Sequence, residues 1–261
     1  MEMLSQAFGK ILRYRQTLGS MFRRKRRAPL QTINVRGKEL HFAFPDETAQ
    51  YEPQVLDYID RLGNQSVFYD LGACVGFFSL YAAARGLKVY AFEIEAKNFS
   101  ALKQNFAANG SFTPRAFQVG VSDGSSQWAD LRVGQDKAGG HHKTLVVEEF
   151  AGPANIVKEE YAIERVRVGA LDDLVAEFQL PLPNHLKIDI DGSEVVFLRG
   201  ARSVLASPQV QSLMMELYEE SPYYQPIVQQ LTDFGFTLTA KHPIDQPWPG
   251  CERLFNCEFW K

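Results

Sequence analysis

From about residue 50 onward, apolar positions follow two alternating patterns, one typical of buried strands and one typical of amphipathic helices. Short apolar runs predict strands at 67–71, 88–92, 116–121, 186–190 and 211–217. Helical spacing predicts helices near 51–62, 77–85, 95–109, 171–179, 193–206 and 223–234. Strands that alternate with helices form βαβ units, so the pattern predicts an α/β fold with a parallel sheet covered on both faces.

Two regions depart from this rhythm. After the last predicted helix, 234–242 and 253–261 read as two strands, which predicts an antiparallel hairpin at a sheet edge. Between 122 and 166, short alternating runs replace helical spacing. A structureless loop of that length is uncommon inside a compact domain, so we expect a small β insertion at about 124–166. An insertion near the mouth of a site often shapes substrate binding.

The first 28 residues form a basic, amphipathic segment. They hold eight Lys and Arg against one acid, whereas 29–261 hold 20 basic and 30 acidic residues. One interpretation is a peripheral membrane contact, with the apolar face among lipid headgroups and the basic residues on anionic lipid. The others are a solvated tail or a helix packed on a neighbouring subunit. We therefore divide the chain into this segment and one domain, 29–261.

Composition narrows the class of protein. A hydrophobic content of 45% and a charged content of 23% in 261 residues are typical of a globular protein with one large core. No apolar run reaches the roughly 18 residues of a membrane span, and no secretory signal is visible. Three cysteines without a histidine cluster argue against a disulfide scaffold or a zinc site. We expect a cytoplasmic protein with buried thiols, at most peripheral to the inner face of the membrane.

A glycine turn follows the first strong strand and indicates the ligand. The stretch Asp70-Leu71-Gly72-Ala73-Cys74-Val75-Gly76 reads D-x-G-x-x-x-G, which is neither a dinucleotide fingerprint nor a P-loop. An acid at the strand end would repel a pyrophosphate but suits the ammonium group of an amino acid. Glycines let the backbone approach, and free N–H groups at the helix start can bind a carboxylate. The turn therefore predicts S-adenosylmethionine, contacted by Asp70, Gly72 and Gly76.

Acids at the ends of the next two strands support this ligand. Glu93 follows the second strand, 23 residues beyond Asp70, where nucleoside-binding α/β folds place an acid that accepts the ribose hydroxyls. Asp123 follows the third strand and could receive the adenine amino group. The alternative is that the glycines serve turns and the acids cap helices. Because such folds bind ligands outside the carboxyl ends of the strands, we expect one cleft there.

Further acids follow the fourth and fifth strands and indicate chemistry on an alcohol. Asp189 and Asp191 end the fourth strand, Glu194 lies in the next helical turn, and Glu216 lies at the matching level of the fifth strand. An alcohol acceptor needs a general base or a hard divalent metal to remove its proton. Two mechanisms stay open: Asp191, Glu194 and Glu216 as Mg²⁺ ligands, or one carboxylate or histidine as base without metal. Glu194 could instead cap its helix.

Two adjacent histidines offer an external base. His141 and His142 lie in the loose stretch GGHHK inside the predicted insertion. If the insertion folds over the cleft, His142 is the candidate to take the acceptor's proton. The alternative is a pair of solvated loop histidines.

Taken together, several segments resemble the FkbM-type family of S-adenosylmethionine-dependent methyltransferases. The matching pieces, over roughly 65–220, are FYDLGACVGFFSL, AFEIEAKNFSALKQN, VGVSDGSSQ, KIDIDGSEVVFLRGA and MMELYEE. The resemblance implies a Rossmann-like fold with a seven-stranded, mostly parallel sheet. It also implies methyl transfer to a hydroxyl on a sugar, a glycan or a glycosylated natural product, and hence a role in polysaccharide or natural-product biosynthesis.

The resemblance also assigns site residues by position. It places Asp70, Gly72, Gly76 and Glu93 at the cofactor and Asp189 beside the cofactor's amino-acid end, with Asp123 a less secure adenine contact. Where many methyltransferases have a proline after the ribose-binding acid, this chain reads Glu-Ile-Glu at 93–95.

Rival functions fit less well. The run RRKRR would suit a nucleic-acid methyltransferase, but the acidic balance of 29–261 would repel phosphates. The fourth strand also lacks the Asn-Pro-Pro-Tyr type of segment that grips a flipped base. A protein that binds S-adenosylmethionine without catalysis would not need the acids at 189–194. A dehydrogenase would need a different glycine spacing.

Overall fold

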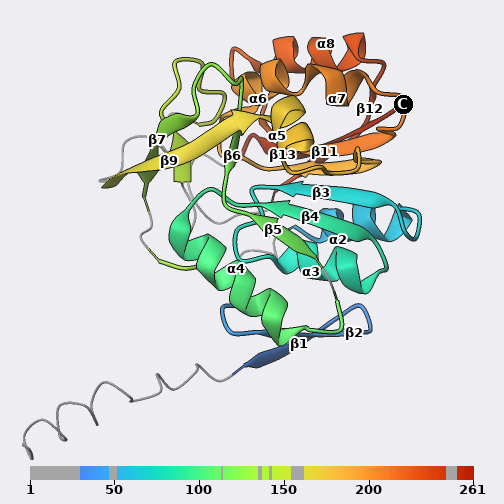
Figure 1. Cartoon of the computed structure of the whole chain (residues 1–261). Coiled ribbons are helices and arrows are strands. Elements are labelled where there is room, and N and C mark those ends of the chain that lie inside the picture. The colour runs from blue at the N-terminus through green and yellow to red at the C-terminus, as the bar shows by residue number, and fades with distance from the viewer. Residues whose placement is uncertain are drawn as a thin grey trace, which may run out of the picture.

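The structure is a computed structural model that describes residues 30–46, 52–112, 114–134, 137–140, 143–153, 162–244 and 252–261 (Figure 1). The basic segment 1–28 and both histidines of 141–142 lie outside these ranges. In chain order the elements are β1 (Gln31–Val35), β2 (Lys38–Phe42), α2 (Pro53–Arg61), β3 (Val67–Leu71), α3 (Phe77–Ala84), β4 (Lys88–Phe92), α4 (Ala96–Ala108), β5 (Arg115–Phe117), β6 (Gly120–Ser122), β7 (Trp128–Val133), β8 (Lys143–Leu145), β9 (Ala162–Ala170), α5 (Leu171–Glu177), β10 (His185–Ile188), α6 (Glu194–Gly200), α7 (Arg202–Ala206), β11 (Ser212–Tyr218), α8 (Tyr224–Asp233), β12 (Thr237–Pro243) and β13 (Leu254–Trp260).

The main sheet has seven strands in the order β12-β13-β11-β10-β3-β4-β5. Strands β11, β10, β3, β4 and β5 run parallel, and β13 runs antiparallel to both of its neighbours, β11 and β12. The predicted α/β fold with a mostly parallel seven-stranded sheet and an antiparallel C-terminal hairpin is confirmed. The edge strands are β12 and β5, and β13 inserts between β12 and β11.

Helices cover both faces of this sheet (Figure 1): α2, α3 and α4 lie on one face, and α5 to α8 lie on the other. Side chains that alternate along each strand divide between two cores. Phe68 and Met214 pack with α2 and α3, whereas Tyr69 and Leu213 pack with the helices of the opposite face. Asp70, two residues beyond Phe68, therefore has the side-chain direction of the α2–α3 face.

The predicted strand 116–121 is two strands. β5 ends the main sheet, and β6 leaves it to pair with β9 of a second sheet with the order β6-β9-β7-β8. The predicted helix 193–206 also divides, into α6 and α7. Gly200 lies at the division, and a Cβ there would lie 1.9 Å from the carbonyl oxygen of Ser122. Close packing of the chain against β6 therefore requires glycine at this position.

The second sheet forms the expected β insertion, with a core of its own that includes Leu131, Val166 and Val168. It lies beyond the carboxyl ends of β3 and β4 (Figure 1). The arrangement brings the insertion next to the edge of the main sheet where a ligand site was expected.

A short hairpin of β1 and β2 was not predicted. It packs on the α3–α4 side of the sheet (Figure 1), where Asn105 of α4 and the C-cap residue Asn109 bond to its backbone in the place of a neighbouring strand. Asn109 accepts the His41 N–H at 2.9 Å and donates to its carbonyl oxygen at 2.7 Å. Asn105 bonds to Ala43 and Phe44 in the same way. Within the described ranges, no helix is long and apolar enough to cross a membrane.

Candidate functional site

A cleft lies at the carboxyl ends of the central strands. The turn after β3, the end of β4, the start of β6, the loop after β10 and the β insertion all contribute to its lining. The space within it is about 710 Å³, a figure that includes space open to solvent. We refer to it as the donor cleft.

The glycine turn brings the backbone of β3 against the loop after β10. Gly72 has φ +81°, and a Cβ at this position would lie 1.7 Å from the carbonyl oxygen of Asp189. Its N–H donates to the carbonyl oxygen of Phe92 at 3.0 Å. A side chain at 72 would therefore force β3 and β10 apart where the cleft begins, so the requirement for glycine is steric as well as conformational.

Glu93 occupies the position expected for a ribose-binding acid. Its carboxylate lines the donor cleft and accepts two backbone N–H groups, from Cys74 at 2.8 Å and from Glu95 at 2.8 Å. Burial raises the pKa of Glu93 to about 7, although these N–H groups and the charge of Lys143 act in the opposite direction. Each oxygen keeps a further lone pair, so the carboxylate can accept hydroxyl donors from a ligand.

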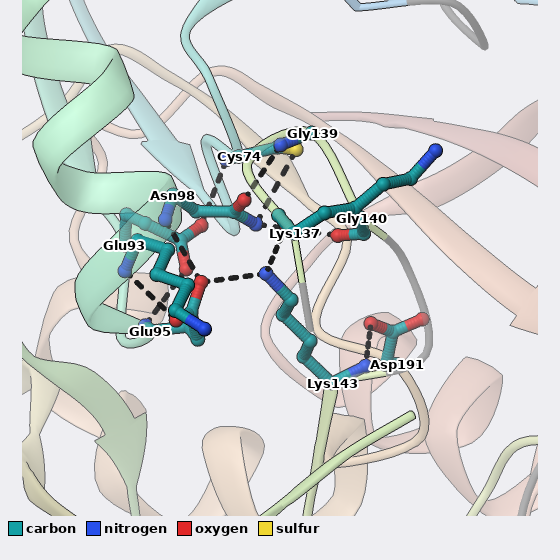
Figure 2. A network of polar contacts seen from close by, with 10 residues as sticks. Cys74, Glu93, Glu95, Asn98, Lys137, Gly139, Gly140, Lys143 and Asp191 are labelled. Carbon is teal, nitrogen blue, oxygen red and sulfur yellow. Dashed lines mark hydrogen bonds and ion pairs between the residues drawn. The ribbon is translucent and has the colours of Figure 1, made fainter. Parts of the chain in front are cut away.

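The insertion contributes to the same cleft through a polar network (Figure 2). The Lys143 ammonium donates to Glu95 Oε2 at 2.6 Å, and its backbone N–H donates to Asp191 Oδ2 at 3.2 Å. Asn98 of α4 accepts the Gly139 N–H at 2.9 Å. These contacts connect the insertion to the start of α4 and to the loop after β10.

Two further features characterise the cleft wall. Ser193 lines the cleft, and its buried hydroxyl has no hydrogen-bond partner among the described residues. A buried hydroxyl without a partner is costly unless a ligand or water bonds to it. Apolar side chains, among them Val119 and Leu131, line the part of the cleft beside the insertion. Among the described residues, the wall therefore combines an apolar surface with one unsatisfied hydroxyl group.

Next to the donor cleft lies an acid cluster, which we define as Glu52, Asp189 and Glu216. One carboxylate oxygen from each lies within 4.8 Å of the others, and Asp189 also lines the cleft. Glu52 accepts from the side-chain amide of Asn256 at 3.0 Å, and Asp189 accepts from the buried Lys187 ammonium at 2.8 Å. No described residue donates a hydrogen bond to Glu216.

Charge repulsion and burial perturb this cluster. Burial raises the pKa of Glu52 to about 7, with a further contribution from the Asp189 charge. Burial and the charges of Asp189 and Glu52 raise the pKa of Glu216 well above its ordinary value. Although burial disfavours a charged amine, the surrounding carboxylates raise the pKa of Lys187. One lysine therefore faces several acids, and the site attracts a proton or a further positive charge.

Asp70 does not have the position expected for a ligand contact. Its carboxylate is 1% exposed, accepts the Ser79 hydroxyl at 2.6 Å, and is not among the described groups that line the donor cleft. Burial raises its pKa, and the charge of Lys187 on the adjacent strand opposes that rise. The cation that Asp70 faces is therefore this lysine rather than the amine of a ligand, because its side chain points beneath α3.

Three other predicted residues also lie away from the cleft lining among the described residues. Gly76, with φ +87°, starts α3, and a Cβ there would lie 2.8 Å from the Phe106 ring. Asp123 accepts the Ser125 N–H at 2.9 Å, which lowers its pKa, and it lies in a separate surface groove. Glu194 is buried, accepts the N–H of residue 192 at 3.2 Å, and has its pKa raised by burial to about 8.

The sequence placed Asp191, Glu194 and Glu216 together as a metal set. The structure instead groups Glu216 with Asp189 and with Glu52, which sequence reasoning missed. Lys143 and Ser193 were also missed, because no local motif marks either one. Glu52 stands at the N-cap position before Pro53, but its side chain makes no capping hydrogen bond and accepts from Asn256 instead, so no local pattern marked it.

Comparisons with known proteins agree with this geometry. The family model described as the methyltransferase FkbM domain matches residues 70–238. A solved methyltransferase FkbM from Methylobacillus flagellatus has 16% identity and a TM-score of 0.52, over 77% of this chain and 44% of that one. This likeness shows the fold, and the chain spans less than half the length of that relative.

Two further structures have lower scores. A precorrin-6y C5,15-methyltransferase from Geobacter metallireducens has 13% identity and a TM-score of 0.48, over 84% of this chain and 93% of that one. A 16S rRNA N2 G1207 methyltransferase from T. thermophilus, solved with AdoMet and guanosine, has 14% identity and a TM-score of 0.44, over 89% and 50% of the two chains. No curated protein sequence matched the chain.

Proposed function

The chain belongs to the FkbM methyltransferase family, whose model covers residues 70–238, and from this premise we propose that it is an S-adenosylmethionine-dependent O-methyltransferase. The acceptor is a hydroxyl on a sugar, a glycan or a glycosylated natural product. One observation carries the proposal: Asp189 belongs both to the donor cleft and to the acid cluster. The donor cleft and the acid cluster, which can accept a proton, therefore lie next to each other.

The residues of the donor cleft fit S-adenosylmethionine. Glu93 can accept the ribose hydroxyls, and the apolar wall at Val119 and Leu131 can cover the adenine. The Ser193 hydroxyl, which has no partner among the described residues, can bond to the donor. Asp189 and Asp191 lie at the β10 side of the cleft, where carboxylates suit the donor's ammonium group. S-adenosylmethionine supplies an activated methyl group when bound.

The acid cluster then supplies the base. An acceptor hydroxyl that takes a methyl group must lose its proton, and a nearby carboxylate is a suitable acceptor for it. Glu216 is the residue we assign, because it has no hydrogen-bond donor among the described residues and its raised pKa makes it a stronger base than an exposed glutamate. Glu52 and Asp189 share the proton within the cluster. His142 stays an alternative base, since it lies outside the described residues.

Mg²⁺ is the competing way to acidify the acceptor. Carboxylate oxygens are the ligands it prefers, and the residues close enough to share an ion are Glu52, Asp189 and Glu216. However, the buried Lys187 ammonium already bonds to Asp189 and supplies positive charge there. Because this charge takes the place that a cation would have beside Asp189, we propose the metal-free route. Turnover unchanged by excess EDTA is expected, whereas a loss that Mg²⁺ restores would assign the cluster to a metal.

The nature of the partner follows from charge. Residues 29–261 hold 30 acidic and 20 basic residues, a balance that suits a neutral acceptor better than a polyanionic nucleic acid. The basic segment 1–28 is proposed as a peripheral membrane contact that places the enzyme near a lipid-linked acceptor at the inner face of the membrane. Flotation with anionic liposomes, compared between the full chain and residues 29–261, tests this; equal flotation would contradict it.

The reaction is tested with a panel of sugars and glycans. The full chain is incubated with S-adenosylmethionine and each acceptor, and release of S-adenosylhomocysteine is measured together with a 14-dalton gain in acceptor mass. An O-methylated sugar is expected. Product release with RNA or DNA alone, or donor binding without any product across the panel, would overturn the O-methyltransferase assignment.

A further inference from the structure

Lys143 is a buried lysine whose charge the proposed chemistry does not use. It is 7% exposed, lines the donor cleft, and comes from β8 of the insertion. Its ammonium donates to Glu95 Oε2 at 2.6 Å and to the carbonyl oxygen of Lys137 at 3.2 Å. Buried ion pairs seldom add stability compared with apolar packing. We therefore look for the role of the Lys143–Glu95 ion pair in the structure that Glu95 organises.

Glu95 organises the start of α4. It is fully buried, and its carboxylate accepts the N–H groups of Lys97 and Asn98, each at 2.8 Å, so it is the N-cap of the helix. Its own N–H donates to Glu93 Oε1 at 2.8 Å. The position of the Glu93 carboxylate therefore depends on the backbone of Glu95, and that backbone depends on the cap.

We propose that Lys143 is a positioning residue for methyl-donor binding: its ammonium fixes Glu95, and Glu95 fixes the Glu93 carboxylate that accepts the donor's ribose (Figure 2). This inference rests on the proposed function and adds that the β insertion is part of the donor site. An insertion that only shaped the acceptor pocket would have no reason to place a buried charge behind the ribose-binding acid.

A second contact set supports the same conclusion. Asn98, in the first turn of α4, accepts the Gly139 N–H at 2.9 Å and donates to the Gly140 carbonyl oxygen at 3.3 Å. The Lys143 N–H donates to Asp191 across the cleft at 3.2 Å. The described residues of the insertion therefore bond to the helix start on one side and to the loop after β10 on the other. Among the described residues, loss of the ammonium removes the ion pair that joins the insertion to the start of α4.

Charge acts in the same direction as geometry. Three described groups act on Glu93: the Cys74 N–H from the turn after β3, Glu95 from the start of α4, and Lys143 from β8. Asp191, which follows β10, lines the same cleft. Of these, Lys143 is the cation, and it favours the ionised form of Glu93. Without it, the carboxyl group keeps its proton to higher pH and accepts fewer hydrogen bonds from a ligand.

The test compares Lys143→Met, Lys143→Arg and the control Arg165→Met in the full chain. Arg165 makes an ion pair with Asp130 in the same insertion, but both side chains are exposed. Calorimetric titration with S-adenosylhomocysteine between pH 6 and pH 9 is the measurement. For Lys143→Met we expect a dissociation constant about 10- to 100-fold higher, the range typical when a partner that orients a binding residue is lost. We also expect the pH midpoint of binding to move upward, with recovery in Lys143→Arg and no change in the control.

If Lys143→Met fails to fold, the double variant Lys143→Met with Glu95→Gln removes the uncompensated buried carboxylate, and its affinity is expected to stay at least about 10-fold weaker. Wild-type affinity and an unmoved pH midpoint in a folded variant would overturn the positioning role while leaving the donor site intact. Failure of the wild-type chain itself to bind would instead overturn the proposed function and this inference with it.

Discussion

Replacing Glu216 with glutamine separates catalysis from folding. The substitution keeps the shape of the side chain and removes its ability to take a proton. Since no described residue donates a hydrogen bond to Glu216, the amide displaces no donor that the described structure contains. The variant should therefore fold, bind the donor and fail at the chemical step.

Two magnitudes follow. General-base catalysis contributes about 10²–10⁴-fold, so turnover should fall by that factor, or about 2.7–5.5 kcal/mol in activation free energy. The nearest oxygens of Glu52, Asp189 and Glu216 lie within 4.8 Å of one another. One carboxylate pair at that distance repels by about 1–3.5 kcal/mol for effective dielectric constants of about 80 to 20. Glutamine at 216 removes this repulsion wherever both groups are ionised, so the free energy of unfolding should stay unchanged or rise.

The assay measures turnover on the acceptor found by the sugar panel, the dissociation constant of S-adenosylhomocysteine, and thermal unfolding. Glu220→Gln, an exposed position just beyond β11, is the matched control and should retain full turnover. Glu194→Gln separates the two candidate acid sets and should affect turnover less than Glu216→Gln does. Full turnover in Glu216→Gln, or a clear loss of stability at neutral pH, would refute the reasoning.

Three further predictions test the fold and the cleft. Gly72→Ala should abolish donor binding and lower the melting temperature, because the added Cβ would lie 1.7 Å from a backbone oxygen. The control is Gly235→Ala: Gly235 also has a positive φ, +91°, but no atom lies within 4 Å of the added Cβ, so this change should cost only about 1–2 kcal/mol in unfolding free energy. Asn105→Ala should destabilise by about 2–4 kcal/mol in urea titration, because it leaves buried backbone groups of the β1–β2 region unpaired, whereas the exposed Gln104→Ala should stay within about 0.5 kcal/mol. Donor affinity should fall as the pH drops through about 7, because Glu93 then takes a proton; an affinity independent of pH would contradict its role. The same raised pKa means that the contribution of Glu93 to the free energy of unfolding decreases as the pH rises from 4.5 to about 7.

Much of the fold followed from the sequence because strand and helix periods were strong in the core. Strands β3 and β4 have the predicted bounds, since both are continuous apolar runs next to turn signals. The β1–β2 hairpin was missed because its place in the fold depends on the side chains of Asn105 and Asn109, which are distant in the sequence, rather than on pairing with the main sheet. The break between β5 and β6 was missed because pattern alone does not reveal a strand that changes sheet.

The candidate site could be predicted only in part. The level of Glu93 along its strand was readable, because an acid directly after a buried run lies at the sheet edge. The direction of Asp70 was not, since it depends on which face α3 covers. Glu52 and Lys143 come from segments far apart in the chain, and only tertiary contacts place them beside Asp189 and Glu95. Sequence spacing also could not show that the Glu194 carboxylate bonds to its own turn.

Calorimetric titration of the full chain with S-adenosylmethionine, run beside NAD⁺ and ATP, tests the identity of the ligand in the donor cleft most directly. The structure predicts saturable binding of S-adenosylmethionine at one site per chain and little or no heat with the two phosphate-containing ligands. Tight binding of NAD⁺ or ATP without a response to S-adenosylmethionine would contradict the account.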